Sequence, residues 1–107
     1  MDSQELLKIS ELDSEGFLSN PSLWSKKIAI QIAEKDGIHQ LNESQWLLIN
    51  SLRKYYFSHR TTPPLRRICH INNMQNNCVA VNFDNHGIEL WKIAGLPNPG
   101  EEAKSYL

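Results

Sequence analysis

The sequence predicts a small, mainly helical domain with an N-terminal β-hairpin and an extended C-terminal arm. The 107 residues, 40% of them apolar, suit one hydrophobic core and leave no room for two domains. Helix start and stop signals recur through the middle of the chain. Near its end, Gly95 can close a helix, and Pro97 and Pro99 prevent another from starting. We therefore expect a single domain over residues 1–107, with residues 96–107 as a mobile arm.

The sequence of the N-terminal part predicts a hairpin followed by a helix. Residues 13–16 are typical of a turn, and the apolar residues within 6–12 and 17–18 suit two short paired strands on either side of it. Asn20-Pro21 follows, with an N-cap and a proline for the first helical position. The apolar side chains after it recur at helical spacing, which predicts a first helix over residues 21–36.

Two further helices are predicted in the middle of the chain. Asn42 and Gln45 can form a capping box, and Trp46 then opens a run of apolar residues at helical spacing. We expect Trp46 to pack against the first helix. The prolines that follow His59 end the second helix, and Pro64 suits the start of a short third one.

The periodicity of residues 78–83 favours a strand, because every second residue from Val79 onward is apolar. Residues 84–87 are typical of a turn. The apolar residues within 88–94 then predict a short last helix, which ends at Gly95 because glycine readily takes the left-handed conformation of a helix end.

Charge is distributed unevenly along the chain. Between Ser44 and Phe83 there are five basic residues and no acidic one. The basic residues are Arg53, Lys54, Arg60, Arg66 and Arg67. One surface of the folded chain is therefore expected to be positive and to suit an acidic protein or a nucleic acid, unless the acidic flanking segments compensate it. Arg66, Arg67 and His70 would then meet the phosphates of a nucleic acid, although the connection before their helix is longer than a helix-turn-helix turn.

The two cysteines, Cys69 and Cys78, lack CxxC spacing, which fits a reducing compartment and argues against a disulfide-stapled domain. Together with His59 and His70 they match no metal-ligand spacing, so we expect no metal site. We also expect no cofactor, because no Gly-rich phosphate loop is present. Neither a signal peptide nor an apolar run of roughly 20 residues is found, which predicts a cytoplasmic protein that does not cross a membrane.

Several short motifs occur in an order that resembles the DsrC/TusE family. They are Gly16-Phe17-Leu18, Trp24, Trp46, Leu52-Arg53-Lys54-Tyr55-Tyr56, Pro64-Leu65-Arg66-Arg67-Ile68 and Lys92-Ile93-Ala94-Gly95-Leu96-Pro97-Asn98-Pro99. The match covers about Leu12 to Pro99, and the Ala-Gly-Leu-Pro-x-Pro ending is its most specific part. The resemblance implies a mostly helical body with an N-terminal hairpin. It also implies a helix for residues 79–83, and we follow it there instead of the periodicity.

The resemblance further implies a sulfur-carrier family. TusE-like members act in the relay that brings sulfur to 2-thiouridine in tRNA, and DsrC-like members work with dissimilatory sulfite reductase. The carrier is a cysteine on the C-terminal arm, and DsrC-like members have a second cysteine on the last helix. The matching positions in this sequence are Glu102 and Trp91. Because a carboxylate or an indole cannot accept a sulfane sulfur, the resemblance implies a member without the carrier thiols.

The sequence therefore favours a non-catalytic binding or regulatory protein of a sulfur-transfer or sulfite-reductase system. Its expected partner-binding residues lie in the basic block and around the start of the arm. They are Arg53, Tyr55, Arg66, Arg67, Lys92, Gly95, Leu96, Pro97 and Pro99. One alternative is an active sulfurtransferase with Cys78 or Cys69 as sulfur acceptor, although their apolar neighbours favour structural roles. The other alternative is a nucleic-acid-binding regulator.

Overall fold

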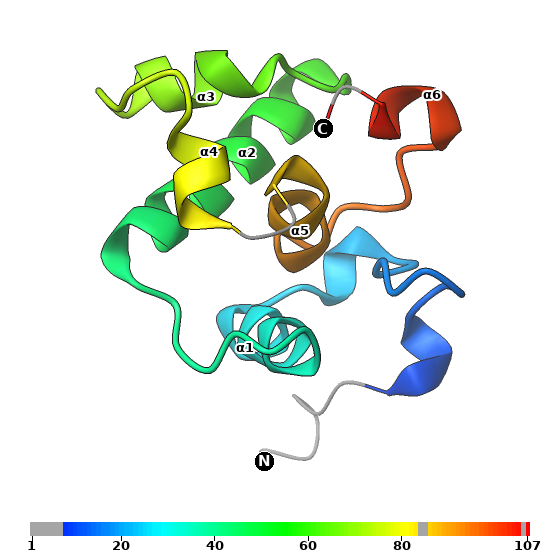
Figure 1. Ribbon diagram of the computed structural model, residues 1–107. Coiled ribbons are helices and arrows are strands. Elements are labelled where there is room, and N and C mark those ends of the chain that lie inside the picture. Colours follow the sequence, from blue (N-terminus) through cyan, green and yellow to red (C-terminus); the bar gives the residue numbers. More distant parts are fainter. Residues whose placement is uncertain (1–7, 84–85, 106) are drawn as a thin grey trace.

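The structure, a computed structural model, describes residues 8–83, 86–105 and 107 and is mainly helical (Figure 1). Its elements are the 3₁₀ helices η2 (Ile9–Glu11) and η3 (Pro21–Leu23) and the α-helices α1 (Lys26–Lys35), α2 (Glu43–His59), α3 (Leu65–Ile71), α4 (Cys78–Asn82), α5 (His86–Ile93) and α6 (Glu101–Lys104). Among these residues no helix is both long and apolar enough to cross a membrane. The predicted helical fold class is confirmed.

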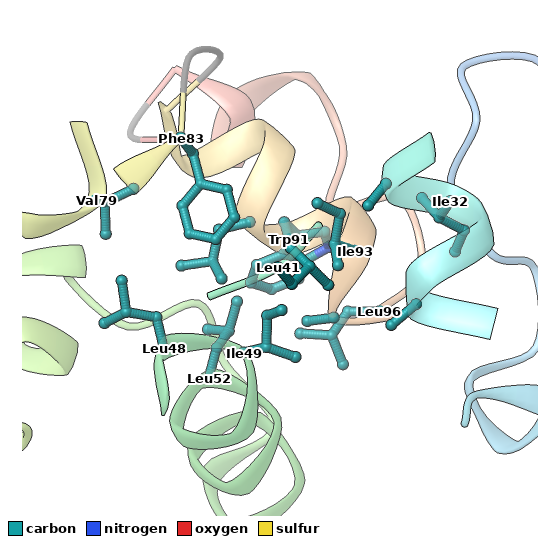
Figure 2. Close-up of a cluster of buried hydrophobic side chains, with 14 of the residues drawn as sticks. Ile32, Leu41, Leu48, Ile49, Leu52, Val79, Phe83, Trp91, Ile93 and Leu96 are labelled. Atoms are coloured by element: carbon teal, nitrogen blue, oxygen red, sulfur yellow. The ribbon is translucent and has the colours of Figure 1, made fainter. Parts of the chain in front are cut away.

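Helix α5 is the centre of the molecule. It contacts α1, α2 and α4, which surround it in Figure 1. Its Trp91 and Ile93 are almost completely buried, and Figure 2 shows them among side chains from α2 and α1. The labelled α2 and α1 residues in that cluster are Leu48, Ile49, Leu52 and Ile32. Since the arm follows directly from α5, the hydrophobic core fixes the point at which the arm begins.

The predicted N-terminal hairpin is wrong for the part of the chain that the structure describes. The turn is present, but only an isolated antiparallel bridge joins Leu12 to Leu18. The Asp13 carboxylate accepts the N–H groups of Glu15 and Phe17, both at 2.9 Å. This local bonding closes the turn without a strand ladder. The apolar residues within 6–7 that were expected to extend the hairpin lie outside the described residues.

The predicted first helix over residues 21–36 is divided in two. Pro21–Leu23 forms a single 3₁₀ turn, and Trp24 is then extended, with φ −68° and ψ 141°. The Ser25 hydroxyl caps α1 by accepting the N–H of Ile28 at 3.2 Å. The break has a consequence for the site, because it turns the Trp24 indole toward the end of α5.

Helix α2 begins as the sequence predicts. The Asn42 side chain accepts the N–H of Gln45 at 2.8 Å, and the Gln45 side chain accepts the N–H of Asn42 at 2.8 Å. Gln45 also donates to the backbone oxygen of Asn82 at 2.7 Å, which links α2 to the end of α4. Trp46 lies beside α1, with the Lys26 ammonium 6.0 Å from its ring centroid. The capping box and the Trp46 contact are confirmed.

The family resemblance, and not the periodicity, is right for residues 78–83. Cys78–Asn82 is a helix in which Val79 is 4% exposed and Val81 is 71% exposed. A strand would have placed these two residues on the same face. His86 and Gly87, predicted within a turn, belong to α5, while residues 84–85 lie outside the described part of the chain. Gly87 suits this place because an added Cβ would lie only 2.4 Å from the Leu65 side chain.

The two cysteines are joined, contrary to the prediction. Cys69 and Cys78 form a disulfide whose Cα atoms are 5.8 Å apart. Both side chains are buried between α3 and α4. Their nine-residue separation matched no redox motif, and only the fold of the loop over residues 72–77 brings them together.

Candidate functional site

The site that the sequence indicated begins at the end of α5, where the segment Ile93–Pro97 forms the arm root. Gly95 has a φ of +72°, a conformation that favours glycine. The two carbonyl oxygens before it are both occupied. The Trp24 indole N–H donates to the Ile93 oxygen at 2.9 Å, and Arg53 Nη1 donates to the Ala94 oxygen at 2.8 Å. Side chains from two distant segments thus satisfy the backbone oxygens at the end of α5 and set the direction of the arm.

Two aromatic rings lie close to the Arg53 guanidinium. Its guanidinium lies 4.0 Å from the Trp24 ring centroid and 5.1 Å from that of Phe57. Burial lowers the pKa of Arg53, but a guanidinium stays protonated under ordinary conditions. Arg53 was predicted to bind a partner, and the structure gives it an internal positioning contact at the arm root.

The other buried contact of the arm root involves Trp91. Its indole N–H donates to the Pro97 oxygen at 2.7 Å, and its ring meets Tyr56 edge to face with 5.6 Å between centroids. Leu96, the residue before Pro97, is fully buried. At the position that matches the second family cysteine, the side chain therefore packs and donates a hydrogen bond instead of offering a thiol.

The arm tip, helix α6 (Glu101–Lys104), returns to the body of the molecule (Figure 1). Lys104 bonds to Glu15 and lies 5.6 Å from the Phe17 ring centroid. Asn98, just before the tip, donates to the Asp13 carboxylate at 3.0 Å and also bonds to Glu15. The prediction of an extended arm is therefore wrong for residues 101–104, because a short helix forms where the tip meets this acidic turn. Mobility of the arm stays a prediction.

The contacts of the arm tip shift the titration of both partners. The hydrogen bond from Lys104, with a further one from Asn98, lowers the pKa of the exposed Glu15 carboxyl. The same bond raises the pKa of Lys104. Burial alone would raise the pKa of Asp13, but hydrogen bonds from the Phe17 N–H, the Asn98 side chain and neighbouring N–H groups outweigh it, so that pKa is lowered too.

The end of the chain also touches the body. A Cβ added to Gly87 would lie 3.0 Å from the Cα of Leu107, next to the Leu65 side chain. Leu107 is partly buried against the hydrophobic core. Glu102, the position that matches the family carrier, is exposed on α6, and its backbone oxygen accepts the Ser105 hydroxyl at 2.6 Å.

The predicted partner-binding residues fall into separate groups. Arg53, Gly95, Leu96 and Pro97 meet at the arm root, as described above, and Pro99 is half-buried further along the arm. Four others lie elsewhere. Lys92 pairs with Asp36 at 3.3 Å, Tyr55 stacks on His59, and Arg66 and Arg67 are exposed on α3.

Helix α3 presents an open basic surface. A hollow of about 450 Å³ is lined by Pro64, Arg66, Arg67, His70 and Ile71. None of the ion pairs within the described residues involves Arg66 or Arg67. The exposed arginines fit the predicted positive surface, while nucleic-acid binding by it stays a prediction. No group of three or more potential metal-binding side chains occurs in the part of the chain that the structure describes.

The sequence reasoning missed the roles of Asp13, Glu15 and Trp24. The sequence pattern predicts that Asp13 and Glu15 are turn residues and that Trp24 lies on a helix face. Each contacts a segment about 70 to 90 positions further along the chain, as the separations of 69, 85 and 89 residues show. No local pattern signals such contacts, because they depend on where the arm returns.

A family profile described as "DsrC like protein" matches residues 7–101. The chain belongs to the DsrC-like family. Sulfurtransferase TusE of Shigella dysenteriae is 30% identical over 99 residues, which cover 83% of this chain and 88% of that protein. Sulfurtransferase TusE of Buchnera aphidicola is 30% identical over 105 residues, which cover 91% of each.

A solved structure of the same family confirms the fold. The oxidized gamma-subunit of the dissimilatory sulfite reductase (DsrC) from Archaeoglobus fulgidus superposes with a TM-score of 0.74 at 25% identity. The superposition covers 84% of this chain and 89% of that one. The family resemblance seen in the sequence is therefore confirmed by a family profile, by relatives and by a fold.

We expect Gly95→Ala to destabilise this DsrC-like protein strongly. An added Cβ would lie 2.1 Å from Trp24 Cδ1, and an alanine also resists a φ of +72°. The combined cost should be roughly 3 kcal/mol in the free energy of unfolding, measured by urea denaturation.

The matched control is Gly37→Ala. Gly37 has a similar φ of +88°, but nothing lies within 4 Å of its added Cβ. Only the backbone cost of about 1–2 kcal/mol should remain. Equal losses for the two variants would show that Trp24 does not constrain the arm root.

The arm tip should detach as acid is added. Glu15 and Asp13 have lowered pKa values in the folded chain, so they stabilise it above their ordinary values of 4.5 and 3.8. This contribution is lost as the pH falls through the lowered values. In ¹⁵N heteronuclear NOE measurements, the amides of residues 101–105 should then become more mobile.

Glu15→Gln should produce this mobility already at neutral pH, because Lys104 loses a charged partner. Glu34→Gln on exposed α1 is the control and should leave the arm amides unchanged. If Glu15→Gln and the unaltered chain give the same NOE values throughout the titration, the ion pair does not hold the tip.

Proposed function

We propose that this DsrC-like chain is a non-catalytic binding protein, which docks through its arm onto a partner in a sulfur-transfer or sulfite-reductase system. One observation carries the proposal. The arm root is built in full around Gly95, Trp24 and Arg53, whereas the only cysteines of the chain, Cys69 and Cys78, lie elsewhere. The position of the arm is thus retained without a thiol on it.

The chemistry of the arm supports binding over sulfur transfer. Accepting a sulfane sulfur requires a thiolate, which attacks the sulfur and later releases it by exchange. Glu102, the position that we match to the family carrier, offers an exposed carboxylate instead. Trp91 offers a buried indole N–H that is already bonded to the Pro97 oxygen. Neither group can carry sulfur.

The class of partner follows from the relatives. Two of them are named sulfurtransferase TusE, and one solved structure is named the gamma-subunit of the dissimilatory sulfite reductase. We infer that this chain binds at the equivalent place in such a system, in the cytoplasm. There it would occupy a docking site without delivering sulfur, or regulate the proteins that do.

The two ends of the arm suit this task differently. At the arm root, the Ile93 and Ala94 oxygens have hydrogen-bond donors and Leu96 is fully buried. The root should therefore hold the direction of the arm when a partner is present. The tip is held mainly by the bonds of Lys104 and Asn98 to the acidic turn. Since Glu15 and Asn98 are exposed, a partner could compete for these contacts. Docking would therefore begin by release of the tip.

We predict that the arm accepts no sulfur. The reduced chain would be incubated with a persulfide donor and examined by intact mass spectrometry and peptide mapping. No sulfur should appear on residues 96–107, because they contain no cysteine. Sulfur retained on Cys78 or Cys69 would favour the alternative of an active sulfurtransferase, and the C69S and C78S variants would identify the acceptor.

Docking itself can be tested with an arm deletion. A chain that ends at Pro99 should lose binding to the sulfite reductase core, or to the sulfur-relay proteins, of the same genome in isothermal titration calorimetry. The control R66A/R67A alters two exposed residues remote from the arm root and tests the basic surface separately. Full affinity after the deletion would overturn docking through the arm.

A further inference from the structure

Cys69 and Cys78 are the two cysteines of the sequence, and the proposed function leaves them unused. Cys69 lies in the last turn of α3, and Cys78 is the first residue of α4. We propose that this pair is a reversible thiol–disulfide exchange site, which reacts with small disulfides such as oxidised glutathione. The reaction does not involve the arm, so its test is independent of the test of docking.

The loop between the cysteines keeps them together without the covalent bond. The N–H groups of Asn72 and Met74 donate to the Cys69 oxygen at 3.1 and 2.9 Å. The N–H of Cys78 donates to the Gln75 oxygen at 3.0 Å. These backbone bonds hold the two Cα atoms near their separation of 5.8 Å. After reduction the two thiols therefore remain neighbours, and a high effective concentration favours closure of the disulfide again.

The site also has an acceptor for the reduced state. The Asn76 backbone oxygen lies 3.7 Å from Cys69 Sγ. A disulfide sulfur has no hydrogen to donate, so this approach becomes a hydrogen bond only when Cys69 is a thiol. In the oxidised state the disulfide joins the two cysteines. In the reduced state the Asn76 backbone oxygen can accept a hydrogen bond from the Cys69 thiol.

Basic residues lie near Cys69 in the sequence, on the same helix. Arg66, Arg67 and His70 lie within three residues of Cys69 on the same helix, and there is no Asp or Glu from Ser44 to Phe83. Positive neighbours stabilise the thiolate, which is the form that attacks a disulfide. In the seven-residue α3, Arg66 is three residues before the buried Cys69, so the two residues lie on the same face of the helix.

Access to the pair passes through the loop. Cys69 is 0% exposed and Cys78 is 5% exposed, so Cys78 is the entry sulfur. The covering loop is exposed at Asn73 and from Gln75 to Asn77, and α4 behind it has only five residues. A local opening of the loop over residues 72–77 would expose Cys78 while α4 keeps its contacts with α5.

The exchange balances as two successive displacements. The Cys78 thiolate attacks one sulfur of a disulfide R–S–S–R, forms a mixed disulfide and releases RS⁻. The Cys69 thiolate then attacks the Cys78 sulfur, forms the intramolecular disulfide and releases the second RS⁻. The protein loses two electrons, the small disulfide gains them, and the two thiol protons end on the released thiols. Reduction follows the same steps in reverse.

The experiment equilibrates the full chain with glutathione buffers of varied ratio, without denaturant. Free thiols are then trapped with iodoacetamide and counted by intact mass spectrometry. The native chain should shift from two alkyl groups to none as the oxidised fraction rises, and back again when the buffer is reversed. A disulfide that opens only in denaturant would overturn the proposal, as would two thiols that stay free in excess oxidised glutathione.

Single variants give a second readout that does not depend on closure of the pair. C69S should accumulate one glutathione adduct on Cys78, because no second thiol can displace it. C78S should form its adduct more slowly, because Cys69 is fully buried. Circular dichroism of both variants checks that they are folded. A faster reaction of Cys69 in folded C78S would contradict the assignment of Cys78 as the entry sulfur.

Discussion

The arrangement of this protein depends on how the C-terminal end of α5 is closed. Two consecutive backbone oxygens, of Ile93 and Ala94, accept hydrogen bonds from Trp24 and Arg53, and Gly95 then reverses the chain. Without these donors the helix end would leave carbonyls unsatisfied beside a hydrophobic core. These two hydrogen bonds thus join the N-terminal segment and α2 to the start of the arm. The Arg53 guanidinium also lies close to the rings of Trp24 and Phe57.

The arm is attached to the body in two physically different ways. Its root is held by buried hydrogen bonds and by Leu96 inside the core, which favours one fixed direction. Its tip is held by the ion pair between the partly buried Lys104 and the exposed Glu15, which salt weakens. This division suits the docking that we propose, in which the tip would leave the body while the root stays in place.

The chain keeps three chemical features in three places. The arm has contacts but no thiol, α3 presents arginines on an open surface, and the cysteines lie between α3 and α4. In the family resemblance, the arm combines position and sulfur chemistry. In this chain both cysteines lie outside the arm, so the arm and the cysteines can each be altered by mutation without the other.

Local signals in the sequence predicted the helical body well. The Asn42–Gln45 capping box, the start of α3 after Pro64 and the glycine that ends α5 each depend on residues a few positions apart. The predicted hairpin is wrong because, in the part of the chain that the structure describes, the pairing is limited to an isolated bridge between Leu12 and Leu18. The alternation after Cys78 failed because burial against neighbouring helices, and not local spacing, decides which valine faces inward.

The sequence by itself determined the family and the absence of cysteine from the arm, and its local signals predicted the helices α2, α3 and α5. Only the tertiary structure decided that Arg53 supports the arm root, that Asp13 and Glu15 receive the arm tip, and that Cys69 meets Cys78. The reason is physical. Caps and turns arise from hydrogen bonds between near neighbours in the chain, whereas these three contacts join segments that only the packing around α5 or the fold of a loop brings within bonding distance.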